Sequence, residues 1–349
     1  GSTIKAIGES LKSFRTVIDM FYIGEVDETK LLDGAIKGYV EGLDDQYSEY
    51  MTKEEWQEFK EEALGKYVGV GIYMTQNDKG EVVVYSTIEG GSAKKAGIQK
   101  DDIIISVDGK SVTGLKTEDV SKMVKGEENT EVITVRRDEE TIDYKLTREN
   151  VKIYHVKSEM LDNETGYISM LSFDEECADE FEKEMDNLIN NGAKKVIFDL
   201  RYNTGGLVDE ALDILDLFVD KDAVTLITKD ATGKETKTIS KNDKKYDIDL
   251  VILVNNYSAS ASEIVTGALK DYGIATIVGT VTYGKGVIQA VYSLEDGSAL
   301  KLTTDEYYTP KNNKINKIGI TPDYEVELTE ENIENGVDPQ LEKAKEILK

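Results

Sequence analysis

The sequence predicts an α/β domain built on a parallel sheet, joined to a smaller β-rich module and to an N-terminal helical segment. Three observations indicate this. Beyond residue 150, apolar strand-like runs alternate with amphipathic helical segments, which is typical of a parallel sheet covered on both faces. Between residues 66 and 149, short β-rich runs are separated by turn signals. Before residue 65, apolar residues recur at helical spacing. The 349 residues suffice for two or three domains.

The composition is acidic and limits the partners to be expected. Lys plus Arg number 42 and Asp plus Glu number 69, for a net charge of −27 at pH 7. Such a chain repels nucleic-acid phosphates and anionic lipid headgroups, so no nucleic-acid partner is expected. The single cysteine, Cys177, excludes an intramolecular disulfide. Its helical spacing with Phe181, Met185 and Leu188 predicts a buried core position rather than a nucleophile.

The chain also has a single histidine, His155, in a segment predicted to form a strand over residues 151–157. Zinc peptidases usually use two or three histidine ligands, and a Ser–His–Asp triad needs its one histidine in place. We therefore expect His155 to be a structural or surface residue. Hydrolytic chemistry in this chain would use another base, and neither a metal nor another cofactor is expected.

Residues 1–65 form the predicted helical segment, which carries two apolar stripes. The stripes comprise Leu11, Phe14, Val17, Ile18 and Phe21, and then Leu31, Leu32, Ala35, Ile36 and Tyr39. Packing on the main body and a homodimer interface are both open as explanations. No apolar run reaches the roughly 18 residues that span a membrane. The opening Gly1-Ser2 resembles a remnant of expression, so a native leader or membrane anchor is also open.

The β-rich module over residues 66–149 contains five predicted strands and one short helix. The strands cover residues 68–74, 82–85, 103–107, 132–136 and 142–146, and the helix covers 117–125. Turn signals such as Asp108-Gly109 separate the strands. The α/β part follows, with strands over 195–200, 250–254 and 275–279 and helices over 207–219 and 260–271. Asp338-Pro339 opens a last helix as its cap and first residue, within a helical tail over 329–349.

Ligands bind parallel sheets at the carboxyl ends of their strands, where the turns at 201–206 and 255–260 are expected to meet. In the second turn, Ser260 lies where a buried strand passes into a helix. The amides and dipole of a helix N-terminus favour negative charge, as the oxyanion of acyl transfer requires. The alternative is structural, because Ser260 and Glu263 also fit a capping box.

Several motifs together resemble the C-terminal processing peptidases, also called tail-specific proteases. Ser-Ala-Ser-Ala-Ser-Glu at 258–263, Gly-Ala-Leu-Lys-Asp at 267–271, the glycines from 279 to 286 around Lys285, and Gln289 resemble that family's active-site signature. Residues 199–206 are similar to its second signature, and 307–310 with 319–323 match its C-terminal one. The resemblance runs from about residue 20 to 328. Thr204 replaces a common proline and Ile274 a common arginine, and neither change removes a catalytic group.

The resemblance implies a role for each site residue. These roles are nucleophile for Ser260, general base for Lys285, orientation of that lysine for Gln289, and oxyanion binding for the backbone amides of Ala261 and of Gly206 or Gly205. Even spacing is expected to place Lys285 and Gln289 on one face of a strand near residues 287–294. To act near neutrality, the lysine pKa must fall from about 10.4 by roughly 3 units, or about 4 kcal/mol. Burial away from carboxylates can cause such a fall.

The β-rich module resembles a PDZ domain through residues 91–97 and 101–109. The resemblance implies a carboxylate-binding loop at 67–72, where successive backbone N–H groups would hold a peptide terminus. Its implied binding residues are Gly69, Val70, Gly71 and Ile72 of the loop, and Thr117, Ser121 and Val124 of the helix. Plain packing is the alternative for each of them.

The expected organisation is a helical segment (1–65), a PDZ domain (66–149), a serine peptidase core (150–328) and a helical tail (329–349). The resemblance implies a bacterial exported, extracytoplasmic endopeptidase that cuts proteins near their C-termini through an acyl-enzyme. The apolar stripes of the helical segment add the expectation of a homodimer. The alternatives are an inactive PDZ adaptor that binds peptides and a ligand carrier on the same fold. Whether the PDZ domain activates, inhibits or tethers is open, as is the substrate.

Overall fold

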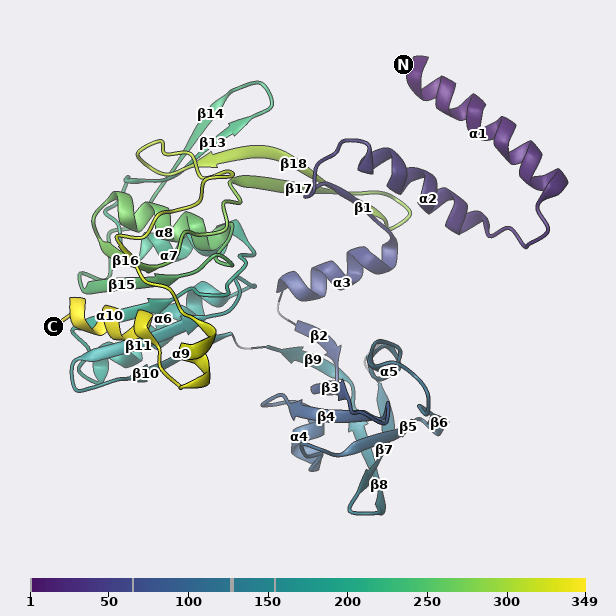
Figure 1. Cartoon of the computed structure of the whole chain (residues 1–349), viewed down its shortest axis with the longest axis horizontal. Helices are drawn as coiled ribbons and strands as arrows, with labels where there is room; N and C mark the ends of the chain where they lie inside the picture. The colour runs from purple at the N-terminus through teal and green to yellow at the C-terminus, as the bar shows by residue number, and fades with distance from the viewer. Residues whose placement is uncertain (1, 65, 126–128, 154) are drawn as a thin grey trace. The chain divides into compact units, whose positions relative to one another are not determined.

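The computed structural model describes residues 2–64, 66–125, 129–153 and 155–349 (Figure 1). The chain divides into two compact units. The first comprises Gly1–Trp56 and Gln289–Thr303, and the second comprises Gln57–Ile288 and Thr304–Lys349. None of the helices within the described residues is both long and apolar enough to cross a membrane.

The first unit combines the N-terminal helices with a β-hairpin. Its elements are α1 (Ser2–Phe21), α2 (Glu28–Glu41), β1 (Glu49–Met51), the start of α3 (Lys53–Leu64) and parts of β17 (Val287–Ser293) and β18 (Ala299–Tyr308). β1 pairs antiparallel with β18, with Tyr50 opposite Leu300. The Tyr50 hydroxyl donates to Asp33 at 3.1 Å and so joins the strand to α2. The predicted helices are confirmed, whereas β1 was not predicted.

The β-rich module is an antiparallel sheet with two short helices. The sheet has the order β3-β4-β5-β7-β8, with β6 paired to β5. The elements are β3 (Ile72–Gln76), β4 (Val82–Thr87), α4 (Ser92–Ala96), β5 (Ile103–Val107), β6 (Lys110–Ser111), α5 (Thr117–Val124), β7 (Thr130–Arg137) and β8 (Glu140–Thr147). Val84, Val120, Ile133 and Val135 are fully buried in its core. The predicted strands over 82–85, 103–107, 132–136 and 142–146 and the predicted helix are confirmed, and α4 and β6 are additional.

A separate two-stranded ribbon, β2 (Lys66–Gly69) with β9 (Glu149–Lys152), flanks this module. The prediction of one strand over 68–74 was wrong, because the chain breaks at Gly71, which has a φ of +83°. The predicted boundary at 149/150 falls inside β9. The strand predicted over 151–157 is also divided, since β9 ends at Lys152 and the next strand starts at Val156. That predicted strand includes Tyr154, which lies outside the described residues. Residues 65 and 126–128 also lie outside them.

The α/β core is a six-stranded sheet of order β10-β11-β12-β15-β16-β19. Its strands are β10 (Val156–Met160), β11 (Thr165–Met170), β12 (Lys195–Asp199), β15 (Asp249–Val254), β16 (Ala275–Gly279) and β19 (Tyr324–Glu325). All neighbours pair in parallel except β10 with β11. One face is covered by α6 (Cys177–Asn190), α7 (Val208–Asp216) and α8 (Ala261–Asp271). Cys177 is fully buried there beside Phe181, as predicted.

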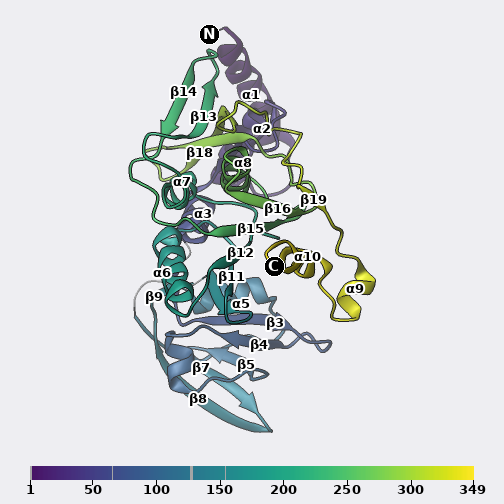
Figure 2. The same cartoon turned by 90° about the vertical axis from the view of Figure 1, so that its left-hand side faces the viewer.

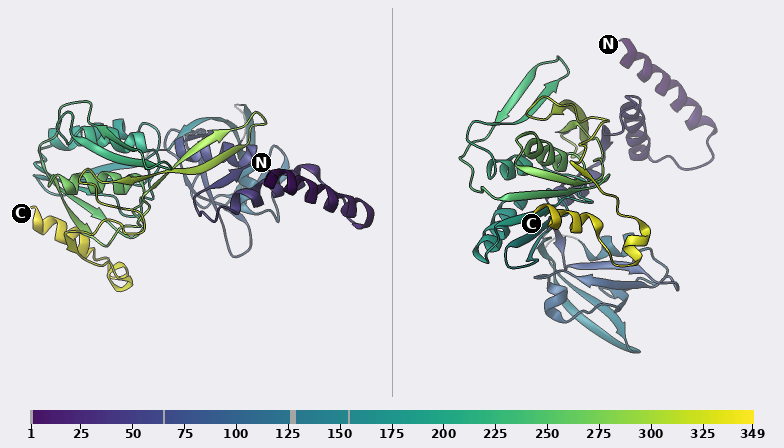
Figure 3. Two further views of the ribbon diagram at one scale, coloured as in Figure 1. Left: turned by 90° about the horizontal axis from the view of Figure 1, so that it is seen from above. Right: turned by 60° about the vertical axis from the view of Figure 1, so that its left-hand side comes forward.

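The other face of the sheet is covered by the C-terminal helix α10 (Pro339–Ile347), which follows the short α9 (Glu330–Glu334). Figures 2 and 3 show α10 on the side of the sheet opposite α6 and α7. Ala344 and Leu348 pack against Ile197, Val251 and Leu253. Asp338 caps the helix, as predicted. The part of this segment that forms α10 is therefore a packed layer of the core, whereas α9 has no buried residue.

A second sheet, which contains β13, β14, β17 and β18, completes the description. β13 (Val224–Asp230) pairs with β14 (Glu235–Ile239) and with the end of β18. β17 pairs with β18 and begins at Val287. The strand predicted near 287–294 is confirmed, and Lys285 precedes it in a loop, so the expectation that Lys285 shares a face with Gln289 stays a prediction.

Candidate active site

Three loops leave the same edge of the core sheet. They are the glycine loop (residues 200–206) after β12, the nucleophile turn (residues 255–260) after β15, and the lysine loop (residues 280–286) after β16. Because β12, β15 and β16 are neighbouring parallel strands, their carboxyl ends lie side by side. This is the edge at which sheets of this kind bind ligands.

Ser260 occupies a strained position at the end of the nucleophile turn. It is the N-cap of α8, with φ 54° and ψ −112°, and only 8% of its surface is exposed. A non-glycine residue rarely adopts such angles, and strain of this kind concentrates at functional sites. A serine on a sharp strand-to-helix turn is also how α/β-hydrolases present their nucleophile.

The two neighbouring serines have a different task. The Ser258 hydroxyl donates to the Leu200 carbonyl at 2.8 Å and accepts from the Asn255 amide at 3.0 Å. The Ser262 hydroxyl donates to the Asn203 carbonyl at 2.8 Å. Both side chains are fully buried. These hydroxyls fasten the nucleophile turn to the glycine loop, which separates them in role from Ser260.

The glycine loop approaches Ser260 so closely that only glycine fits. A Cβ on Gly205 would lie 2.9 Å from the Cβ of Ser260, and one on Gly206 would lie 2.3 Å from the Phe173 carbonyl oxygen. The Gly205 amide donates to the Asn203 side chain at 2.9 Å. Within the described part of the chain, no acceptor is found for the Gly206 amide. Of the two glycines, Gly206 is thus the one whose N–H is available for an oxyanion.

Glu263 links the nucleophile turn to the lysine loop. Its Oε1 accepts from the Ser260 amide at 3.1 Å and from the Lys285 amide at 2.9 Å. Its Oε2 accepts from the Thr282 hydroxyl at 2.6 Å and the Gly284 amide at 2.9 Å. The side chain is fully buried, and this burial raises its pKa. The four hydrogen bonds act in the opposite direction, because they favour the charged form. The sequence indicated only the capping contact.

Tyr307 makes a second link between the same two segments. Its buried hydroxyl lies 3.0 Å from the Ser260 carbonyl oxygen and also bonds the Lys285 carbonyl. The N–H groups of Ser260 and Lys285 thus share one carboxylate oxygen, and their carbonyls share one hydroxyl. Tyr307 belongs to the motif at 307–310, but its contacts could not be predicted from the sequence.

Gln289 belongs to the first unit, whereas Ser260 and Lys285 belong to the second. On β17, its side-chain amide donates to the Thr303 hydroxyl at 3.2 Å. The Thr303 amide in turn donates to the Ser48 hydroxyl at 3.0 Å. The role of Gln289 toward Lys285 stays a prediction.

The predicted peptide-binding residues of the β-rich module lie at the β2–β3 junction and on α5. The loop residues Gly69, Val70, Gly71 and Ile72 are buried. The Val70 carbonyl accepts from the Ala93 amide at 3.0 Å, which holds the loop against α4. On α5, Thr117 and Ser121 are half-buried, whereas Val124 packs in the core of the module. Thr117 and Ser121 thus keep accessible surface on α5.

His155 lies outside any strand, with its Nε2 3.4 Å from Oδ2 of buried Asp174. Burial lowers the histidine pKa and raises the pKa of Asp174 to about 7. Asp174 follows Phe173, whose backbone pairs with the glycine loop. Across residues 2–64, 66–125, 129–153 and 155–349, no group of three or more His, Cys, Asp or Glu side chains is placed to hold a metal ion.

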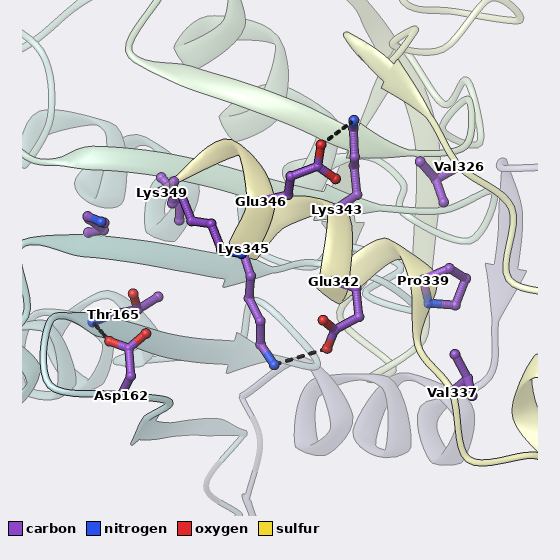
Figure 4. A pocket seen from close by; sticks show the side chains of 12 residues that line it. Asp162, Thr165, Val326, Val337, Pro339, Glu342, Lys343, Lys345, Glu346 and Lys349 are labelled. Carbon is purple, nitrogen blue, oxygen red and sulfur yellow. Dashed lines mark hydrogen bonds and ion pairs between the residues drawn. The ribbon is translucent and has the colours of Figure 1, made fainter.

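A depression of about 760 Å³ lies at the opposite edge of the sheet, beside α10 (Figure 4). Its lining includes Asp162, Thr165 and Lys195 at the amino ends of β11 and β12. Lysine–glutamate pairs within α10, such as Lys345 with Glu342 at 3.1 Å, form another side. This hollow contains none of the predicted site residues.

Family models match three parts of the chain. Peptidase family S41 matches residues 164–326, a PDZ domain matches 83–137, and the activating protease CtpB N-terminal domain matches 6–55. A protein of Staphylococcus aureus described as a probable CtpA-like serine protease is 39% identical over 316 residues, or 89% of this chain. One from Staphylococcus haemolyticus is 37% identical over 311 residues, or 87% of this chain. The chain spans 63% and 62% of these two relatives.

The solved structure of the photosystem II D1 C-terminal processing protease is also similar. It has a TM-score of 0.54 and 29% sequence identity, and the match covers 92% of this chain and 87% of that one. These matches follow the same order along the chain as the helical segment, the β-rich module and the α/β core. Residues 164–326 therefore match peptidase family S41 and residues 83–137 match a PDZ domain, and the chain as a whole is similar to PDZ-containing C-terminal processing peptidases.

Proposed function

We propose that this chain is a serine endopeptidase that cuts polypeptides near their C-termini, with Ser260 as nucleophile and Lys285 as general base. The observation that carries the proposal is the strained turn at Ser260, whose backbone is fastened to that of Lys285 through Glu263. Such fastening limits how far the two reacting side chains can drift apart.

In the proposed reaction, the Ser260 hydroxyl oxygen attacks the scissile carbonyl carbon while its proton passes to the neutral amine of Lys285. The amides of Gly206 and Ala261 stabilise the oxyanion, and the Ala261 amide is one of the N–H groups that a helix leaves unpaired. Lys285 then protonates the leaving amine. It next takes a proton from water, whose oxygen attacks the acyl-enzyme ester, and returns that proton to the Ser260 oxygen as the ester bond breaks. Gln289 is proposed to accept an N–H of the lysine and aim its lone pair.

Covalent labelling tests the nucleophile directly. A fluorophosphonate should modify the intact chain, and mass spectrometry of its peptides should place the label on Ser260. The Ser260→Ala variant should not be labelled, whereas the matched Ser262→Ala variant should. A label on Ser258 or Ser262, or labelling of Ser260→Ala, would contradict the assignment.

We further propose that the PDZ domain reads the substrate's C-terminus and activates the peptidase core. Its loop at Gly69 to Ile72 contains Gly71 in a left-handed conformation, and such turns expose amides to a carboxylate. A tenfold activation needs about 1.4 kcal/mol of preference for the active state. A peptide with a free apolar C-terminus should raise cleavage of an unrelated reporter, and the amidated peptide should not. Slower cleavage with the free peptide would instead indicate tethering.

The N-terminal helices support a proposal of homodimerisation. On α1, Phe14, Val17 and Phe21 are each more than half exposed. Light scattering should give the mass of a dimer for the intact chain and that of a monomer for Phe14→Glu. A wild-type monomer at micromolar concentration would contradict this. We also place the protein outside the cytoplasm, which fractionation of cells that produce it can check.

A further inference from the structure

A row of large exposed side chains follows the carboxyl ends of four neighbouring parallel strands. Leu171 comes after β11, Tyr202 after β12, Tyr257 after β15 and Tyr283 after β16, and each is more than half exposed. Single exposed apolar residues are ordinary on protein surfaces. Here, however, the four share one edge with Ser260. Since neighbouring strands lie about 4.8 Å apart, the row extends over about 14 Å across the four strands.

The two central members of the row form a fixed pair. The rings of Tyr202 and Tyr257 stack with centroids 5.6 Å apart and planes at 25°. One buried oxygen, Asn255 Oδ1, accepts the Tyr202 amide at 3.0 Å and the Tyr257 amide at 3.1 Å. The backbones that carry the two rings are therefore held by the same atom, and the exposed stack is pre-organised.

Tyr202 is also strained, with a φ of +63°. This left-handed conformation suits glycine or asparagine and costs free energy for a bulky aromatic residue. The side chain gains little burial in return, because 53% of the residue is exposed. A strained and exposed aromatic residue within the glycine loop indicates a binding role rather than a packing role.

The pair lies close to the proposed reaction centre along the chain. Tyr257 is three residues before Ser260, and Tyr202 is three residues before Gly205, which approaches the Ser260 Cβ. Three residues span at most about 11 Å. An extended substrate advances about 3.3 Å per residue. The rings can therefore reach a substrate side chain within about three positions of the scissile bond.

We infer that Tyr202 and Tyr257 form an apolar subsite that binds a large apolar or aromatic side chain of the substrate polypeptide near the cut. This inference rests on the proposed peptidase function. The flat ring faces provide the contact area, and the tyrosine hydroxyls can bond the substrate backbone at the rim. A subsite of this kind makes the two tyrosines specificity-determining residues.

Peptide cleavage kinetics test the subsite. Internally quenched peptides carry Phe, Leu, Ala or Ser at each of the three positions on either side of the cut. The wild type should favour Phe and Leu over Ala at one position. Tyr202→Gly combined with Tyr257→Ser should lower kcat/KM about tenfold more for the Phe peptide at that position than for the Ala peptide. Glycine suits the backbone at position 202, so the fold should persist.

Two further variants serve as controls. Tyr257→Phe keeps the ring and should keep the preference. Tyr272→Ser removes an exposed tyrosine before β16, at the opposite edge, and should change nothing in selectivity. An unchanged profile in the double variant, with Ser260 still labelled by fluorophosphonate, would overturn the subsite and leave the peptidase function intact. Cleavage that survives in Ser260→Ala, or no cleavage by the wild type, would overturn the proposed function and the subsite together.

Discussion

The two edges of the core sheet are built from the same strands but from different kinds of interaction. At the carboxyl edge, the polar side chains of Asn203, Ser258 and Glu263 are fully buried and hydrogen-bonded. At the amino edge, charged groups meet in water, as in the pair Lys194–Glu164, whose side chains are 74% and 51% exposed. A buried polar group that loses its partner costs its full desolvation, whereas an exposed pair contributes about 0–1 kcal/mol.

This difference shows which features mark a site on this molecule. The depression of about 760 Å³ lies at the amino edge, where the ion pairs are on the surface. The carboxyl edge instead combines backbone strain at Ser260 and Tyr202 with polar side chains that are buried away from water and depend on hydrogen bonds within the protein. Strain and buried hydrogen bonding therefore separate the two edges better than the size of a hollow does.

Removal of the proposed nucleophile should give the largest effect. Ser260→Ala should lower kcat on unfolded casein by at least about 10⁴-fold, because the acyl-enzyme cannot form. Ser262→Ala at the same edge should lose far less, since its hydroxyl only fastens the turn. The rate at which cleavage products of casein form in each variant can be measured by gel electrophoresis and by mass spectrometry. A comparable decrease in kcat in both variants would contradict the distinction between the two serines.

The base is tested by a change that keeps its charge. Lys285→Arg retains a cation but has no free lone pair near neutral pH, so it should be as inactive as Lys285→Ala. In the wild type, kcat/KM should rise with pH as the amine loses its proton. Activity of the arginine variant within tenfold of wild type would show that another group acts as base.

The link between the nucleophile turn and the lysine loop should come next in size. Glu263→Gln places an amide N–H₂ where a carboxylate oxygen now receives two donors. We expect kcat to fall about 10²-fold and stability to fall by about 2–4 kcal/mol. Labelling of Ser260 by fluorophosphonate should slow in parallel. The matched change at the amino edge, Glu342→Gln, should alter neither quantity, and a normal labelling rate in Glu263→Gln would argue against the link.

Asp174 tests the carboxyl edge through pH. Burial raises its pKa to about 7, so the folded protein holds a proton that the unfolded chain releases near pH 4. The resulting stabilisation is complete below about pH 4 and is lost as pH rises to 7. Asp174→Asn cannot ionise, so its free energy of unfolding should gain on that of the wild type across that window, by up to about 4 kcal/mol at pH 7 and above. A difference that stays flat from pH 4 to 8 would be inconsistent with this picture.

The smallest effect is expected at the amino edge. Lys345→Ala removes an exposed ion pair with Glu342. Stability should change by no more than about 0.5 kcal/mol, and casein cleavage should be unchanged. Chemical denaturation and a turnover assay measure both. A loss of turnover above about twofold would show that the hollow beside α10 contributes to function after all.

The sequence by itself determined the order of the parts, most of the core elements and the identity of the candidate nucleophile. Residues 275–279 form the predicted strand, and the turn before α8 carries Ser260 where expected. These features are local. Apolar periodicity, a strand-to-helix transition and a run of small residues are each set within about ten residues of chain, so they are visible without knowing what packs on them.

Only the tertiary structure decided which groups hold the site together. Glu263 reads as a simple helix cap, yet its carboxylate also receives the amides of the lysine loop, about twenty residues further along the chain. Tyr307 reaches Ser260 and Lys285 in the same way, and α10 covers a sheet face that a tail would have left open. Contacts between distant segments depend on the register and packing of the whole sheet. No window of sequence contains that information.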